Sequence, residues 1–280
     1  MTDTVEQFMT KKPFVLKLPS NVSEAMKIMA KRDVAAVPVT NSKGEYAGIV
    51  TRRDILENPK EDEISLLMRK DLPVLSPKDP IERAAEYFVK IRRRHLPVLD
   101  NNKVVGILTP YDLLDAVIIK NPQKTIREVM KSVAIPVYHK STARMVEKVI
   151  RLTKITAFPV LDDDGKLVGI ITERDLLNGA NLDVKTVSSQ LGIGEDDDSW
   201  SWESLRDIFT FYYTVRDLKL PEITIDKIMS TNPKTIFEGS PVAEAAKIMK
   251  KNKFTQLPVN DLENDISGMV YDFDIISSLL

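Results

Sequence analysis

Four aspartates recur at one position of a repeated segment, and three of them follow a threonine by three residues. The pairs are Thr51 and Asp54, Thr109 and Asp112, and Thr172 and Asp175, whereas the fourth aspartate, Asp274, follows Tyr271. A carboxylate can accept two hydroxyl donors, and the amides of a helix N-terminus favour an anion. The recurrence of an aspartate at one position therefore indicates a recurring site. The spacing of threonine and aspartate is also that of a capping box at a helix start, so both interpretations stand.

Basic residues near the same segments are candidates for contact with phosphate. Arg94 and His95 end the basic run KIRRRH, and Arg53 and Arg174 each stand just before one of the aspartates. A guanidinium offers a planar fork that fits phosphate oxygens. The alternative for the run is a solvated helix end whose charges suit the C-terminal dipole.

Four copies of one segment carry these residues. In each copy a proline follows a methionine by 29 residues, and a glycine follows the proline by 9 or 10. The aspartate stands six residues after that glycine. A fixed period of about fifty residues indicates a repeat architecture. We expect the copies at 1–58, 62–120, 123–180 and 222–280, with an insertion at 181–221.

Each copy predicts the same order of elements, helix–β–α–β–β–α. A short helical turn ends at the methionine, and an extended segment follows it. Apolar residues at i, i+3, i+4 and i+7 then predict a helix with one buried face, as in Val22, Ala25, Met26 and Met29. We place the N-caps of these helices at Ser20, Asp79, Ser141 and Ser240. Two strands joined by a polar turn come next, and the last helix begins near the aspartate.

Composition excludes several classes of function. The chain has 280 residues, no cysteine and a formal net charge of −1. The missing cysteines exclude disulfides, thiol catalysis and Cys-based zinc sites, and the balanced charge disfavours a nucleic-acid binder. We expect a cytoplasmic protein with no membrane segment, since neither a signal peptide nor a spanning apolar run is present. We also expect neither an enzyme nor a metal site, because no catalytic motif is found.

The insertion combines an acidic run with a high density of aromatic residues. Glu195 to Asp198 form the run, and Trp202, Leu205, Phe209 and Tyr212 follow at helical spacing. Packing against the repeats is the favoured interpretation of this apolar face. Docking of a protein partner is the alternative.

The repeat resembles the CBS domain. The ligand signature of that family, Gly–apolar–apolar–Ser/Thr–x–x–Asp, reads GIVTRRD at 48–54, GILTPYD at 106–112 and GIITERD at 169–175. The fourth copy departs from it as GMVYDFD at 268–274. The resemblance implies an α/β (α+β) fold in which four βαββα repeats pair into two modules that form a disc. In architecture the chain is similar to archaeal stand-alone CBS proteins and to the gamma subunit of AMP-activated protein kinase.

The resemblance also implies a regulatory protein that binds AMP, ADP or ATP between paired repeats. Each aspartate would accept the ribose hydroxyls, each threonine would meet the phosphate, and the basic residues named above would add to the phosphate contact. Tyr271 implies altered phosphate contacts in the fourth copy, where Asp272 could cap the helix. S-adenosylmethionine as the ligand, and a scaffold with vestigial sites, remain open alternatives. A protein partner is expected, and the chain is expected to be a monomer or a homodimer.

Overall fold

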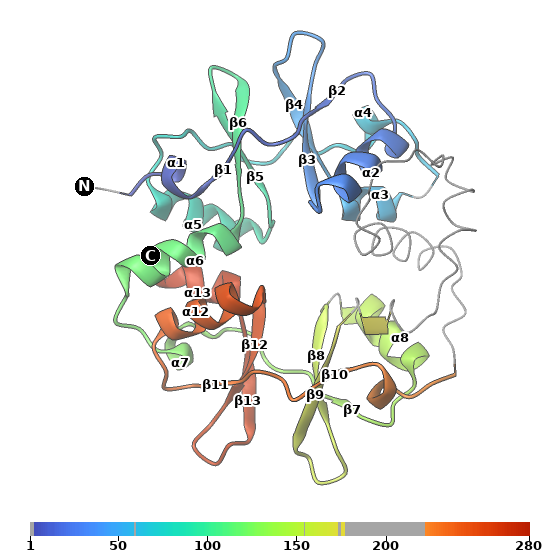
Figure 1. Cartoon of the computed structure of the whole chain (residues 1–280), viewed down its shortest axis with the longest axis vertical. Coiled ribbons are helices and arrows are strands. Elements are labelled where there is room, and N and C mark those ends of the chain that lie inside the picture. Colours follow the sequence, from blue (N-terminus) through green and yellow to red (C-terminus); the bar gives the residue numbers. More distant parts are fainter. Residues whose placement is uncertain (1–2, 59, 154, 173–174, 177–221) are drawn as a thin grey trace.

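The four copies, here called repeats 1 to 4, lie around a flat disc (Figure 1). The computed structural model describes the whole chain except residues 1–2, 59, 154, 173–174 and 177–221. Repeats 1 and 2 form one half of the disc, and repeats 3 and 4 form the other. The predicted insertion at 181–221 lies outside the described residues.

The predicted order of elements is confirmed in repeats 1 and 4, whereas in repeat 2 the extended segment between the first two helices forms only an isolated β-bridge, Leu75 with Val98. Repeat 1 contains α1 (Val5–Phe8), β1 (Thr10–Lys11), β2 (Leu16–Lys17), α2 (Val22–Lys31), β3 (Ala36–Thr40), β4 (Tyr46–Thr51) and α3 (Arg52–Glu57). Repeat 2 contains α4 (Ile64–Leu67), α5 (Ile81–Ile91), β5 (Leu96–Asp100), β6 (Lys103–Leu108) and α6 (Pro110–Lys120).

The second half of the chain repeats this order. Repeat 3 contains α7 (Ile126–Val129), β7 (Val137–Tyr138), α8 (Ala143–Thr153), β8 (Ala157–Leu161) and β9 (Leu167–Thr172). Repeat 4 contains η1 (Ile225–Lys227), β10 (Ser230–Thr231), β11 (Ile236–Phe237), α12 (Val242–Asn252), β12 (Gln256–Asn260), β13 (Ile266–Tyr271), α13 (Asp272–Ile276) and η2 (Ser277–Leu279).

The amphipathic helices of repeats 1, 2 and 4 have the buried face that their apolar spacing predicts, whereas in repeat 3 Glu147 stands at the third position of the stripe and only Ala143, Val146 and Ile150 are buried. In α2 the predicted stripe of Val22, Ala25, Met26 and Met29 is buried. The predicted N-caps are wrong by one residue in three of the repeats. Asn21 caps α2 by accepting a hydrogen bond from the Glu24 N–H at 3.0 Å, and the N-caps of α5 and α12 are prolines with extended backbone.

The N-terminal segment of each repeat is exchanged with its partner. Strand β1 of repeat 1 pairs with β6 of repeat 2, and β10 of repeat 4 pairs with β9 of repeat 3. In the other direction, Arg69 of repeat 2 forms a β-bridge with Ile49 of repeat 1, and Ser132 bridges Met269. Each pair of repeats is therefore interlocked into one module.

The repeated methionine and the repeated glycine meet across this exchange. A Cβ atom on Gly106 would lie 2.3 Å from the Met9 Sδ, and one on Gly48 would lie 2.7 Å from the backbone oxygen of Arg69. Gly169 and Gly268 have the same relation to Met229 and Met130. Only glycine lets the partner segment approach this closely, which explains why the two residue types recur together.

The two modules join through the helices of repeats 2 and 4. Helices α5 and α6 contact α12 and α13, and the buried apolar residues of these helices form one continuous cluster, which includes Leu113, Val117, Ala246 and Met249. Among the described residues, most buried apolar side chains of repeats 1 and 3 form separate clusters, whereas their exchanged N-terminal segments, with Val5 and Val129, belong to the cluster of repeats 2 and 4. Repeats 2 and 4 therefore form the continuous core between the modules.

Candidate functional site

The threonine–aspartate pairs lie where the second strand of each hairpin turns into the last helix. In repeat 1 the Asp54 Oδ2 accepts hydrogen bonds from the Thr51 N–H at 2.9 Å and the Thr51 hydroxyl at 2.6 Å. Asp112 and Asp175 take the corresponding bonds from Thr109 and Thr172, at 2.6 to 2.8 Å. The capping-box interpretation is confirmed for all three pairs. In each pair these bonds use one carboxylate oxygen, Oδ2.

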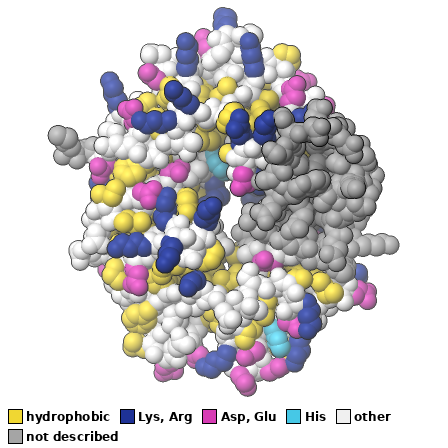
Figure 2. Space-filling model, in the orientation of Figure 1, with side chains coloured by type: hydrophobic (Ala, Val, Ile, Leu, Met, Phe, Trp, Pro, Cys, Tyr) yellow, Lys and Arg dark blue, Asp and Glu magenta, His cyan; other side chains and the backbone are white. Residues whose placement is uncertain are grey.

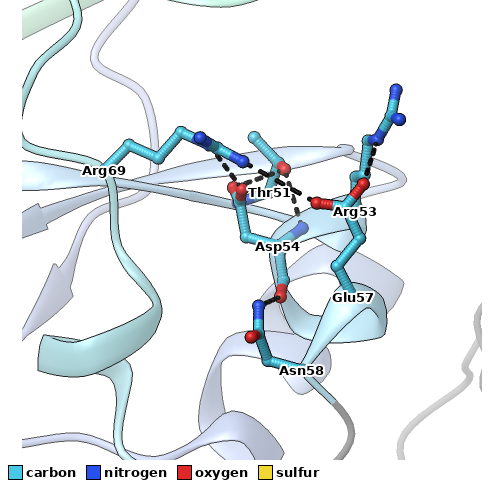
Figure 3. Close-up of polar contacts among 6 residues, drawn as sticks. All are labelled: Thr51, Arg53, Asp54, Glu57, Asn58 and Arg69. Carbon is cyan, nitrogen blue, oxygen red and sulfur yellow. Dashed lines mark hydrogen bonds and ion pairs between the residues drawn. The ribbon is translucent and has the colours of Figure 1, made fainter.

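The carboxylate of Asp54 is also held by an arginine from the other repeat. The Arg69 Nε donates to the Asp54 Oδ1 at 2.6 Å (Figure 3). Only 3% of the Asp54 side chain is exposed, against 29% for Arg69. Arg69 comes from the exchanged segment of repeat 2, so this site is built by both repeats. The motif of repeat 1 does not point to Arg69, because this arginine lies in another repeat.

Arg53 does not join this cluster. The Arg53 Nε donates instead to the Glu57 Oε1 at 2.8 Å, one turn along the exposed side of α3 (Figure 3). Its neighbour Arg52 is more buried, with 24% of its side chain exposed. Positions 52 and 53 are successive residues of the helix, so their side chains are rotated about its axis and point in different directions. Arg174, the equivalent candidate of repeat 3, lies outside the described residues.

His95 belongs to the same site as Asp54, although the two come from different repeats. The surrounding protein lowers the pKa of His95 from 6.5 to about 4 by desolvation, and the charges of Arg94 and Arg52 act in the same direction. The charge of Asp54 opposes this shift. The imidazole is therefore neutral near pH 7, and the positive charge around Asp54 is carried by arginines.

Arg94 faces the other module. Its guanidinium donates to both oxygens of Asp272, with the Nη1–Oδ1 distance at 3.2 Å. Asp272 is the first residue of α13 and is fully buried, whereas 40% of the Arg94 side chain is exposed. Asp272 does not cap α13 as the sequence suggested, because its carboxylate binds Arg94 and the adjacent Phe273 N–H. Arg94 therefore connects repeat 2 to repeat 4.

Asp274 of repeat 4 has one oxygen without a partner. Its Oδ2 accepts a hydrogen bond from the Tyr271 N–H at 3.0 Å, whereas its buried Oδ1 has no hydrogen-bond partner. The Arg92 Nη2 lies 4.0 Å from this Oδ1. Burial raises the pKa of Asp274, although the Tyr271 N–H and the charge of Arg92 oppose the shift. A buried acceptor that lacks a donor is costly, so this oxygen is suited to a ligand hydroxyl.

Asp112 of repeat 2 has a neighbour from repeat 4. Burial raises the pKa of Asp112, against the hydrogen bonds from Thr109 and the charge of Lys250. The Lys250 Nζ lies 2.8 Å from the Asp115 Oδ2 and 4.4 Å from the centroid of the Tyr111 ring. A residue of the second module thus lies beside a site of the first.

Charges of both signs lie on the visible face of the disc. Figure 2 shows Lys and Arg side chains interspersed with acidic and apolar ones, without one continuous basic surface. This face is hollowed near the centre of the disc. No group of three or more His, Cys, Asp or Glu side chains suited to a metal ion is found among the described residues. None of the helices in the described ranges is long and apolar enough to cross a membrane.

Comparison with known proteins identifies the family. The CBS domain model matches residues 5–61, 62–119, 126–180 and 225–280, so the chain belongs to the CBS domain family. The CBS domain-containing protein CBSCBSPB1 of Arabidopsis thaliana is 27% identical over 288 residues, which cover 95% of this chain and 52% of that protein. The chain therefore spans about half the length of this relative.

An enzyme also contains a similar segment. The A-adding tRNA nucleotidyltransferase of Aquifex aeolicus is 33% identical over 116 residues, which cover 40% of this chain and 14% of the enzyme. A CBS match alone therefore does not decide whether a protein is catalytic, and the absence of catalysis here stays a prediction.

Two solved archaeal structures share the complete architecture. An uncharacterized conserved protein from Pyrococcus horikoshii has a TM-score of 0.71 and 25% identity, and the match covers 99% of this chain and 100% of that one. MJ1225 from Methanocaldococcus jannaschii, proposed to be an archaeal homolog of γ-AMPK, has the same TM-score and coverage at 20% identity. The predicted fold of four CBS repeats in a disc is confirmed.

Proposed function

We propose that the protein is a regulatory module that binds adenine nucleotides between paired CBS repeats. The observation that carries this proposal is the buried Oδ1 of Asp274, which has no hydrogen-bond partner at the family's ribose-binding position. An ionised carboxylate offers acceptors only, so this oxygen suits the hydroxyl donors of a ribose. Asp54, Asp112 and Asp175 occupy the equivalent position in the other repeats.

The charges beside Asp54 favour a phosphorylated ligand over S-adenosylmethionine. Arg52 and Arg94 both act on His95, which lies near Asp54, and Arg69 contacts that carboxylate directly. A sulfonium cation would be repelled by these arginines, whereas a phosphate would be attracted. AMP, ADP and ATP are therefore the proposed ligands.

The proposed mechanism is a shift between two mutual arrangements of the repeats. A nucleotide that contacts both repeats of a pair favours one arrangement, which changes the surface presented to a protein partner. The size of this effect is limited by the difference in nucleotide affinity between the two arrangements. Neither catalysis nor a metal is needed for it.

Isothermal titration of the intact chain, stripped of bound ligand, tests this proposal. AMP, ADP and ATP are expected to bind at more than one site, and S-adenosylmethionine is expected to bind more weakly. Asp112→Asn and Asp274→Asn are each expected to weaken one site by about 10- to 100-fold, because each removes a charged acceptor. Absence of binding by all four ligands would leave the threonine–aspartate pairs as helix caps alone.

A further inference from the structure

The four site aspartates are not equally available to a ligand. Both oxygens of Asp54 already accept hydrogen bonds: Oδ2 from Thr51 at 2.9 and 2.6 Å, and Oδ1 from the Arg69 Nε at 2.6 Å. In repeat 4, by contrast, the buried Oδ1 of Asp274 has no hydrogen-bond partner, and the Arg92 Nη2 lies 4.0 Å away from it. An arginine therefore occupies the acceptor oxygen in repeat 1, whereas the equivalent oxygen in repeat 4 has no bound donor.

The backbone of Arg69 is fixed in place. Its N–H donates to the Ile49 oxygen at 2.8 Å, and its own oxygen accepts from the Ile49 N–H at 3.0 Å. That oxygen also lies 2.7 Å from the position of a Cβ on Gly48. The side chain is less constrained, since it is 29% exposed and its Nη2 lies 3.8 Å from the Glu57 Oε2. A ligand can therefore displace the guanidinium without moving the strand.

We propose that Arg69 determines the ligand specificity of the repeat 1 site. A ribose that binds the Asp54 Oδ1 displaces the Arg69 guanidinium from it. A ligand with a phosphate supplies a new anion for that guanidinium, whereas a ligand without one leaves it only the more distant Glu57, at 3.8 Å. The site therefore favours phosphorylated nucleosides over uncharged ones. This inference rests on the proposed function, and it adds a basis for selection at the repeat 1 site.

The selectivity is measured by titrating the intact chain with AMP and with adenosine, which differ only in the phosphate. The repeat 1 site is the binding step that Asp54→Asn removes. In Arg69→Gln we expect adenosine to bind this site more tightly and AMP more weakly. The ratio of the two affinities should fall by about tenfold or more, as for one charge-assisted hydrogen bond.

Two comparisons separate specificity from a structural role. Arg83→Gln removes another arginine that pairs with an aspartate, at 3.0 Å from Asp79, and should leave the ratio unchanged. In an Asp54→Asn background, which lacks the repeat 1 step, Arg69→Gln should leave the AMP-to-adenosine ratio of the remaining binding steps unchanged. A purely structural Arg69 would lower the melting temperature and weaken both ligands equally.

The results distinguish this inference from the proposed function. An unchanged AMP-to-adenosine ratio in Arg69→Gln, or a change that persists without Asp54, overturns the inference alone. Binding of AMP at steps that depend on Asp112 or Asp274, with none that depends on Asp54, also overturns it alone. If the unaltered chain binds neither AMP nor adenosine, the inference and the proposed function both fail.

Discussion

Each site aspartate occupies the same position of its repeat, yet its neighbours come from different parts of the chain. Asp54 binds Arg69 of the paired repeat, Asp112 lies near Lys250 of the other module, and Asp274 keeps one oxygen without a partner. The affinity and selectivity of a site depend on such neighbours as much as on the motif. Four copies of one motif therefore do not imply four equal sites.

His95 should make the stability of the protein depend on pH. Its pKa is about 4 in the folded protein, against 6.5 for an unperturbed histidine. The unfolded chain therefore binds more protons between these pH values, so stability falls as pH drops from 6.5 toward 4. In His95→Gln this decline should be shallower, by at most about 1.4 kcal/mol per pH unit. Urea unfolding at pH 7 and pH 5 measures the difference.

Other titrating groups act in the opposite direction, so the comparison with the variant is essential. Burial raises the pKa values of Asp112 and Asp274, so these groups add stability as pH falls through their folded-state pKa. Both remain in His95→Gln and cancel in the difference. An identical pH dependence in the two proteins would contradict a lowered pKa for His95.

Two equivalent aspartates should respond differently to the same substitution. Asp54→Asn removes the anion 2.6 Å from the Arg69 Nε and leaves that guanidinium only Glu57, at 3.8 Å, so it should lower the free energy of unfolding by about 1–3 kcal/mol. Asp274→Asn removes a buried charge whose Oδ1 has no hydrogen-bond partner and lies 4.0 Å from the Arg92 Nη2, so its cost should be below about 1 kcal/mol. Urea unfolding of both variants without ligand tests this, and equal costs would contradict it.

At the scale of the elements, the spacing of Met, Pro, Gly and Asp predicted the four repeats, and the apolar pattern within each copy predicted most of its helices and strands. This spacing could not predict that each methionine packs on the glycine of the paired repeat. The Met-to-Gly spacing within a copy would be the same if each methionine packed on the glycine of its own copy. The capping interpretation followed from Thr–x–x–Asp, since that geometry is local. Arg69 could not be found in this way, because its contact with Asp54 depends on the exchange of segments.

Gly48 should tolerate alanine poorly. An added Cβ would lie 2.7 Å from the backbone oxygen of Arg69, which is fixed by its bridge to Ile49. We expect Gly48→Ala to lower the free energy of unfolding by about 1–3 kcal/mol, as for overpacking elsewhere in protein cores. At Gly106 the three atoms nearest to the added Cβ all belong to the side chain of Met9.

This difference supplies the control for the glycine substitutions. Shortening the facing methionine should relieve Gly106→Ala in the double variant with Met9→Ala. The corresponding change, Met68→Ala, should not relieve Gly48→Ala, because the clash is with backbone. Equal rescue at both positions in thermal or urea unfolding would show that the exchanged backbone at Arg69 can move.

At the scale of the whole molecule, repeats 2 and 4 share one apolar core, whereas the described parts of repeats 1 and 3 have cores of their own. The apolar stripe of each helix predicted a buried face, but a stripe does not specify which helix covers it. The sequence pattern did not predict the polar contact between the modules either. Arg94 and Asp272 are separated by most of the chain and belong to no common motif.

Removing Arg94 should lower the free energy of unfolding more than removing its ion-pair partner Asp272. Asp272 is fully buried, whereas 40% of the Arg94 side chain is exposed. Arg94→Gln leaves a buried carboxylate without its cation and should cost about 1–3 kcal/mol, less than a fully buried pair because solvent screens the arginine. Asp272→Asn should cost less, since the freed guanidinium can turn to water.

Urea unfolding of Arg94→Gln, Asp272→Asn and the double variant measures this asymmetry. The double variant should cost less than the sum of the single ones, because removing the second partner also removes the unpaired charge. Lys166→Gln, which breaks the exposed pair with Asp265, should change stability far less. If Asp272→Asn proved as costly as Arg94→Gln, direct attraction would outweigh desolvation, and the pair would act as a strong bond between the two modules.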